Sequence, residues 1–437
     1  MISTFYVNLA SIYHFFYFFF IWNLFISICH SKLLKDFNFA FLVNSCFICV
    51  FFLIQSYIYP DAYGTTSPIG RAWTDDSYFF ALAADSIPEN LFLRDNYFLY
   101  EHFFSSFVKN LTPFYISHPL DVVFFQSGSI GVLAAFTKEF SNSKCQDTRV
   151  GSFAYYLIIL CPFLMMNGGV IFIRDTLIAA MLIYFIYCID NKKYLFAIIA
   201  IIFQFALRPG TALATIVAGL VINWHQFIKT ITKYKYFASF IFLTILALVY
   251  SLFNSFDKVI ELYLSGTSEG GAISIVGRSL LNNLLIASSD SNQYFLQIQQ
   301  LPFIAKSIFS GSYIFLYPFL NFEEAFGNTI DVRAFLMNLI IPIQLFWLNS
   351  WFFAAIFTKE KHFKGINKII ISIAIILMII GLYSLQTRHK TFIYPLYYMA
   401  VSYGFIYGDS KSKIIGYSLS GFLLLIQVLA NFRGAIL

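Results

Sequence analysis

The sequence predicts an all-α, polytopic integral membrane protein, and its composition is the first reason. Of the 437 residues, 59% are apolar and 11% are charged, and the mean hydropathy is +0.73. Soluble domains contain about 45–50% apolar and about 25% charged residues. Apolar runs of about 20 residues, the length of a helix that crosses a bilayer, recur along the chain. We therefore expect a single transmembrane domain over residues 1–437.

Twelve membrane-spanning helices are expected, connected by short polar turns or by longer loops. They cover residues 9–30, 37–59, 119–136, 151–168, 173–190, 194–209, 210–227, 236–254, 334–357, 367–386, 391–408 and 414–432. The turns after the first, third, fifth, seventh, ninth and eleventh helices are rich in lysine and arginine. Assigning them to the cytoplasm gives that side a net charge of +10 and the other side −4, which agrees with the formal total of +6. Short cytoplasmic loops favour Lys and Arg, so both termini are expected outside.

Two outer loops, residues 60–118 and 255–333, are too long to be simple connections. Both contain apolar residues at helical spacing, so we expect short amphipathic helices that lie at the membrane interface. The apolar stretch 301–320 is interrupted by Lys306, Gly311 and Pro318. It either enters the membrane and returns, or it crosses, and a crossing would reverse the orientation of all that follows.

Two arginines, Arg174 and Arg208, flank a pair of apolar runs whose connecting turn contains Lys192 and Lys193. With the lysine turn in the cytoplasm, both arginines face outward. A glycine pair precedes the first arginine and a Pro-Gly pair follows the second, so backbone breaks adjoin both. Arginines in such places contact either lipid headgroups or an anionic ligand, and the breaks favour a ligand.

Candidate catalytic residues lie in the first outer loop. Asp75 and Asp76 precede an expected amphipathic helix, and His118 and Asp121 lie near the C-terminal end of the loop. A carboxylate or histidine suits general-base activation of a hydroxyl group. The structural interpretation is that an aspartate caps the following helix and that His118 only precedes a proline.

Further basic candidates on the outer side are Arg278, Arg388, His389 and Lys390. Several arginines at one site suit a phosphate or pyrophosphate, because guanidinium groups bind phosphate oxygens through two parallel hydrogen bonds. The run from Arg388 to Lys390 is equally interpretable as an anchor for lipid headgroups.

Neither a cofactor nor a metal is expected. The six cysteines lie in apolar runs or in a loop assigned to the inside, without the spacing of a Cys/His metal site or of a disulfide framework. The sequence contains no glycine-rich phosphate loop.

Several of these segments together resemble the bacterial O-antigen and exopolysaccharide polymerases, the Wzy and EpsG-like families. The resemblance covers the layout of nearly the whole chain and a few short motifs: Asp75–Tyr78, Phe172–Ala180 and Arg388–Tyr394. Arg208 followed by Gly219 is similar to an Arg-x₁₀-Gly element of such polymerases.

The resemblance implies a GT-C-type glycosyltransferase in the bacterial inner membrane, acting on undecaprenyl-pyrophosphate-linked oligosaccharide repeat units at the periplasmic face. The growing chain would be transferred to the next unit, with undecaprenyl pyrophosphate as leaving group. Arg174, Arg208, Arg278, Arg388, His389 and Lys390 would bind the pyrophosphate and glycan. Asp75, Asp76 or His118 would accept the proton. Expected partners are this lipid-linked glycan, membrane lipids and a chain-length regulator protein, and no nucleic acid.

Three other functions stay open. A transferase that adds one sugar or branch to a lipid-linked glycan shares this layout, and the pair Asp75 and Asp76 favours it. An O-antigen ligase differs mainly in its acceptor. A flippase or transporter normally shows an internal repeat or paired broken helices with charges at the midplane, and the sequence places its charges at the outer ends.

Overall fold

A computed structural model describes residues 9–58, 99–112, 116, 120–165, 174–225, 303–322, 335–359, 363, 365–383 and 387–436 of the chain. All regular structure within these ranges is helical, which confirms the predicted all-α class. The long apolar helices among them support a membrane protein.

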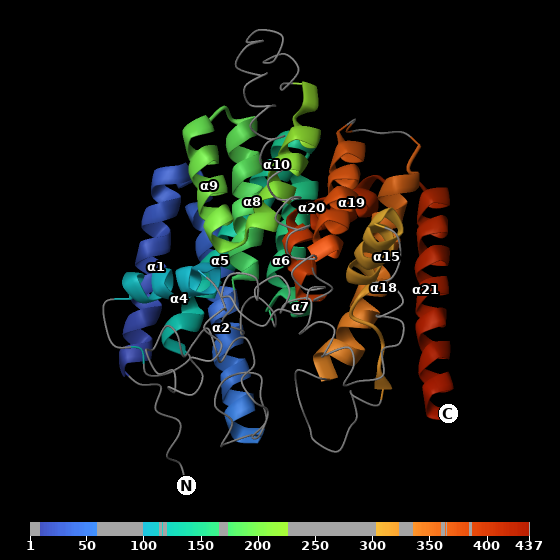
Figure 1. Cartoon of the computed structure of the whole chain (residues 1–437), viewed down its shortest axis with the longest axis horizontal. Helices are drawn as coiled ribbons and strands as arrows, with labels where there is room; N and C mark the ends of the chain where they lie inside the picture. Colours follow the sequence, from blue (N-terminus) through green and yellow to red (C-terminus); the bar gives the residue numbers. More distant parts are fainter. Residues whose placement is uncertain are drawn as a thin grey trace, which may run out of the picture.

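The helices fall into two groups, drawn in blue to green and in orange to red in Figure 1. The first group contains α1 (Leu9–His30), η1 (Ser31–Leu33), α2 (Leu34–Ile58), α4 (Leu99–Leu111), α5 (Leu120–Cys145), α6 (Thr148–Ile159), α7 (Pro162–Leu164), α8 (Asp175–Asp190), α9 (Tyr194–Leu207) and α10 (Pro209–Ile222). The second contains α15 (Phe303–Leu316), η4 (Leu336–Ile340), α18 (Ile341–Phe357), α19 (Ile366–Tyr383), η5 (Thr387–Ile393), α20 (Tyr394–Tyr407) and α21 (Ser410–Ile436).

The expected count of twelve spans is not met by the described residues. Four stretches are long and apolar enough to cross a membrane: Ile12–Phe51, Leu120–Cys145, Asn338–Phe357 and Ser410–Leu429. Several other helices coincide with expected spans but are short. A helix of 14 residues, such as α9, α10 or α20, is about 21 Å long, whereas the hydrocarbon core is about 30 Å thick.

One further expected span is interrupted, and another lies outside the described residues. The helix expected at 151–168 is interrupted, because α6 ends at Ile159 and Pro162 begins a new turn. The span expected at 236–254 lies outside the described residues.

Helix α5 forms the centre of the first group, where it packs against α1, α2, α6 and α8. Helices α1 and α5 approach each other closely at Gly128 of α5, where an added Cβ atom would lie 1.9 Å from Nε1 of Trp22 in α1. A larger residue there would push the two helices apart. In the second group, α18 packs against α20 and α21, and α20 also packs against α6 of the first group. The two groups therefore form one helical bundle (Figure 1).

One end of this bundle, uppermost in Figure 1, gathers the turns that the sequence assigns to the cytoplasm. Three contacts join them: Lys138 to Asp36 at 2.8 Å, Lys144 to Asp190, and Lys193 Nζ to the carbonyl oxygen of Cys29 at 2.9 Å. The hydroxyl of Tyr407 donates a hydrogen bond to Asp147, so the end of α20 lies at the same end of the bundle. We call residues 29–36, 138–149, 190–193 and 407–413 the lysine-rich end.

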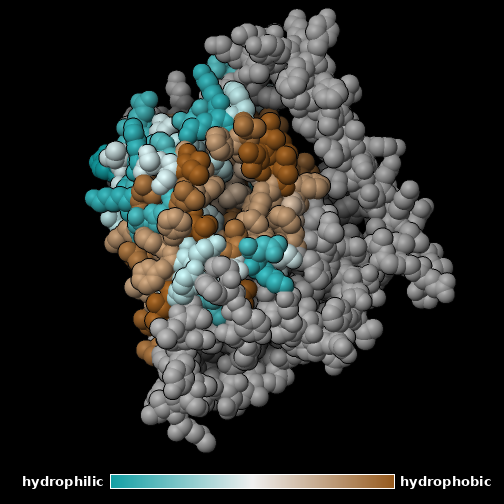
Figure 2. Space-filling view, turned by 90° about the vertical axis from the view of Figure 1, so that its left-hand side faces the viewer, coloured by the Kyte–Doolittle hydropathy of each residue, from teal (hydrophilic) through white to brown (hydrophobic). Residues whose placement is uncertain are grey.

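The predicted grouping of the turns after the first, third, fifth and eleventh spans at one end is thus confirmed. Figure 2 shows hydrophilic side chains toward the upper end of the viewed face and hydrophobic ones toward its middle. Helix α1 begins and α21 ends at the opposite, lower end (Figure 1). Which end faces the cytoplasm stays a prediction.

Candidate anion-binding site

Arg174, Asp175 and Arg208 meet where three helices begin or end. Arg174 directly precedes α8, and Asp175 is the first residue of that helix. Arg208 separates α9 from α10, with extended backbone angles of φ −166° and ψ 106°. Helix α9 ends here because Pro209 disfavours a helical conformation in the residue before it, whereas proline suits the first position of α10.

The contacts between these residues confirm that the two arginines come together. Arg208 Nη1 lies 3.0 Å from Asp175 Oδ1. Arg174 Nη1 donates a hydrogen bond of 2.9 Å to the carbonyl oxygen of Leu207, the residue that precedes Arg208. Arg174 and Asp175 are buried, with exposed fractions of 9% and 4%.

A third side chain reaches the same carboxylate from the C-terminal part of the sequence. His389, in η5, is buried and places its Nε2 3.9 Å from Asp175 Oδ1. This segment packs against α8, which fixes the imidazole beside the carboxylate. We call Arg174, Asp175, Arg208 and His389 the arginine cluster.

The described groups of the arginine cluster favour an anion. Arg208 pairs with Asp175, Arg174 bonds the nearby carbonyl oxygen of Leu207, and α8 and α10 both begin there. The first turn of a helix carries backbone N–H groups without intrahelical partners and the positive end of the helix dipole. Buried charges in a membrane protein are costly to maintain, so such a group is a functional-site hypothesis by default.

The arginine cluster also lies deep in the bundle. Helix α8 has 16 residues and is about 24 Å long, while its neighbour α5 has 26 residues and is about 39 Å long. The two helices end together, because Lys144 near the end of α5 pairs with Asp190 at the end of α8. Asp175 therefore begins α8 about 15 Å inward from the far end of α5.

Lys390 occupies a different environment from its neighbour His389. It is fully buried, and its ammonium donates to the carbonyl oxygens of Phe315 and Tyr317, the latter at 3.0 Å. These carbonyls end α15, where a cation suits the negative end of the helix dipole. Among the described contacts, Lys390 joins α15 to η5, whereas the sequence suggested a ligand for pyrophosphate.

The other candidates from the sequence are not placed. Asp75, Asp76, His118 and Arg278 lie outside the described residues. The backbone of Arg388 belongs to η5, but its side chain is not described. Of the basic candidates, Arg174, Arg208 and His389 therefore lie together.

Sequence reasoning overlooked two features. Asp175 was not among the expected site residues, although this carboxylate lies against both Arg208 and His389. Sequence reasoning also overlooked His14, whose Nδ1 lies 3.3 Å from Oδ1 of Asp121, with both side chains fully buried between α1 and α5. The sequence signal for Asp175 was its place as an acidic residue at the start of an apolar helix, where it complements the helix dipole.

Comparison of the chain with protein-family models, curated proteins and solved structures gives no match. The function is therefore argued from the site itself.

Proposed function

We propose that the protein joins lipid-linked oligosaccharide repeat units, with the pyrophosphate of the donor bound at the arginine cluster. The observation that carries the proposal is the meeting of Arg208 and His389 at the buried Asp175, with Arg174 bonded to the carbonyl oxygen of Leu207 beside them, far from the lysine-rich end. A polymerase of undecaprenyl-pyrophosphate-linked glycans needs such a site for its leaving group, and the sequence resemblance points to the same class.

In the proposed reaction, the bond between the anomeric carbon and the donor pyrophosphate breaks, and that carbon forms a bond to a hydroxyl oxygen of the acceptor. Arg174 and Arg208 bind the departing pyrophosphate, whose charge grows in the transition state. His389 accepts the hydroxyl proton, and the Asp175 carboxylate, 3.9 Å away, stabilises the charged imidazolium. Asp75, Asp76 and His118 stay alternative proton acceptors outside the described residues.

The proposal includes a finer architecture than the described helices establish. The short helices α8, α9, α10 and α20 cross the membrane together with the long ones, in a twelve-span bacterial inner-membrane protein. The lysine-rich end faces the cytoplasm, and the loops 60–118 and 255–333 face the periplasm. Alkaline phosphatase fused at Ser86 or Ser289 should then be active, and at Asn191 it should be inactive. The reverse pattern would contradict this orientation in the membrane.

One observation favours a second candidate, a flippase for the same lipid-linked glycan. The arginine cluster lies about 15 Å inward from the end of α5, and Arg208 separates two helices of 14 residues each. Transporters commonly bind anionic groups at the ends of helices that stop within the membrane.

Deleting the gene and examining the surface polysaccharide separates the candidates. Loss of a polymerase leaves core carrying one repeat unit. Bare core indicates a flippase or ligase, and a full ladder whose units lack one sugar indicates a single-sugar transferase. An unchanged polysaccharide would overturn the proposal.

A further inference from the structure

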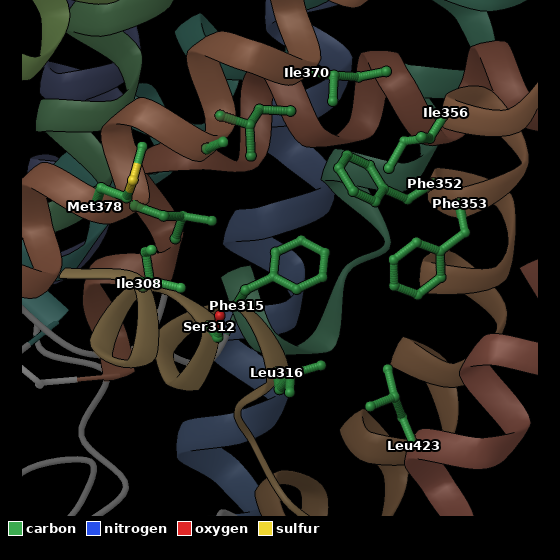
Figure 3. A pocket seen from close by; sticks show the side chains of 14 residues that line it. Ile308, Ser312, Phe315, Leu316, Phe352, Phe353, Ile356, Ile370, Met378 and Leu423 are labelled. Carbon is green, nitrogen blue, oxygen red and sulfur yellow. The ribbon is translucent and has the colours of Figure 1, made fainter. Parts of the chain in front are cut away.

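Two places within the described part of the bundle differ in character. Between α15, α18, α19 and α21 lies an open pocket of about 460 Å³, whose lining is apolar apart from the hydroxyl of Ser312 (Figure 3). Between α8, α9 and α10, inward of the arginine cluster, the interior instead contains polar side chains. Gln204 of α9 and Thr215 of α10 are both fully buried there.

Gln204 lies on the only face of α9 that is turned into the protein. The buried positions of this helix are Ala197, Ala200, Gln204 and Leu207, a spacing that places them on one side. This face packs against α8 and α10. Within the described part of the chain, neither the amide oxygen nor the amide nitrogen of Gln204 has a hydrogen-bond partner.

Thr215 is turned toward the same place from α10. It lies one helical turn before Gly219, on the same side of the helix. Gly219 faces α8, because an added Cβ atom would lie 2.6 Å from Cε1 of Phe185. Among the described residues, the Thr215 hydroxyl also has no hydrogen-bond partner.

Both side chains lie a short distance inward of the arginine cluster. The contact between Arg208 and Asp175 sets the end of α9 and the starts of α8 and α10 at one level. From there, Gln204 is about 6 Å and Thr215 about 10 Å further along the helices. Residues 179–182 of α8, at the same levels, are all apolar, so their side chains offer no partner.

Unpaired polar groups in a protein interior call for an explanation. Each one costs about 1–3 kcal/mol when it is left without a hydrogen bond. Apolar side chains at these two positions would avoid this cost, and the rest of the buried face of α9 is apolar. Buried water commonly satisfies such groups and makes about three hydrogen bonds to them.

We propose that α8, α9 and α10 hold a small water-filled chamber, lined by Gln204 and Thr215 and entered past Arg208. The Arg208 side chain is 18% exposed, so the chamber is reached from the arginine cluster. The ring of Phe185 against Gly219 closes it toward the lysine-rich end. The chamber does not depend on which anion the arginine cluster binds.

The test is the reactivity of cysteines introduced one at a time into the full chain, purified in detergent. Gln204→Cys and Thr215→Cys are treated with hydroxyethyl methanethiosulfonate, a small neutral thiol reagent. The mass of the labelled protein is followed over time, with the native chain and its six cysteines as background. The reagent attacks the thiolate, and apolar burial raises the pKa of a thiol, so labelling reports contact with water.

The matched controls are Ala200→Cys on α9 and Ala218→Cys on α10. Both positions lie one turn or less beyond the chamber, toward the lysine-rich end, and are 2% and 0% exposed. Gln204→Cys and Thr215→Cys should be labelled at least about tenfold faster, the effect of one unit of thiol pKa. Equal rates in all four variants would overturn the inference.

A second measurement needs no cysteine. Gln204→Leu should leave the melting temperature unchanged or raise it, because a hydrated amide has no protein partner to lose. Asn44→Leu is the control, since the buried amide of Asn44 donates a hydrogen bond of 3.0 Å to Ser127 Oγ. This variant should melt at a lower temperature. An equal fall in Gln204→Leu would show that its amide is bonded within the protein and would remove the chamber.

Discussion

The two ends of the helical bundle use similar charged residues in different ways. At the lysine-rich end, cations pair one to one with carboxylates on neighbouring turns; Lys138 and Asp36, 25% and 26% exposed, are an example. In the arginine cluster, Arg208 and His389 meet at Asp175, which is 4% exposed, and Arg174 bonds a backbone carbonyl beside them. Exposed pairs contribute little to stability, whereas buried charges are costly unless they are well paired. The first arrangement marks an ordinary surface and the second a site.

The largest effect is expected from Asp175→Asn. Removing one partner of a buried charged group leaves the others uncompensated, which costs about 3–5 kcal/mol. The unfolding free energy of the purified protein should fall by this amount. Asp36→Asn, at the lysine-rich end, is the matched control and should cost about 1 kcal/mol or less. Equal losses in the two variants would erase the distinction between the ends.

The next effect concerns Arg208, where charge and geometry can be separated. If the guanidinium binds pyrophosphate through two parallel hydrogen bonds, Arg208→Lys keeps the charge but cannot make this pair of bonds. Polymer formation should then fall about 10- to 100-fold, nearly as far as in Arg208→Ala. The measurement is the polysaccharide ladder of a deletion strain that expresses each variant at matched levels. A full ladder from Arg208→Ala would remove this residue from the mechanism.

A smaller effect is expected at Lys390, which joins α15 to η5. Lys390→Met keeps the apolar stem and removes the hydrogen bonds to Phe315 and Tyr317, so stability should fall by about 1–3 kcal/mol. His389 would also be held less firmly. Activity should fall through kcat more than through KM, and an unchanged kcat at lower stability would restrict Lys390 to a purely structural role.

The smallest effect is expected at Arg149, on the surface of the lysine-rich end. Its side-chain hydrogen bond, followed by that of Tyr407, holds the pKa of Asp147 well below the usual range. Because the folded pKa is depressed, the stabilisation is present above the unfolded pKa of about 3.9 and is lost as pH falls through the folded value. Arg149→Ala should lower the melting temperature slightly at pH 7.

This small difference between Arg149→Ala and the native protein should shrink below about pH 4, as Asp147 becomes protonated in the unfolded state. It should also shrink in high salt, because exposed charges are screened. Melting curves between pH 3 and 8 measure both trends. A difference that grows in acid would contradict the assigned cause.

Much of the bundle could be predicted from the sequence, and so could part of the site. The periodic apolar runs located α1, α2, α8 and α21 within a few residues, whereas α5 continues to Cys145, beyond its expected end at residue 136. The break between α9 and α10 was expected from the Pro-Gly pair after Arg208, but hydropathy does not show that Pro162 interrupts a span. The pairing of Arg174 with the Arg208 region followed from two helices joined by a short turn.

By itself, the sequence determined the all-α class and the collection of lysine-rich turns at one end, because both follow from local composition and from alternating directions of successive helices. Only the tertiary structure decided that Asp175 lies against both Arg208 and His389 and that Lys390 bonds the end of α15. These contacts join segments up to about 200 residues apart. They depend on how helices of unequal length pack, and no local pattern encodes that packing.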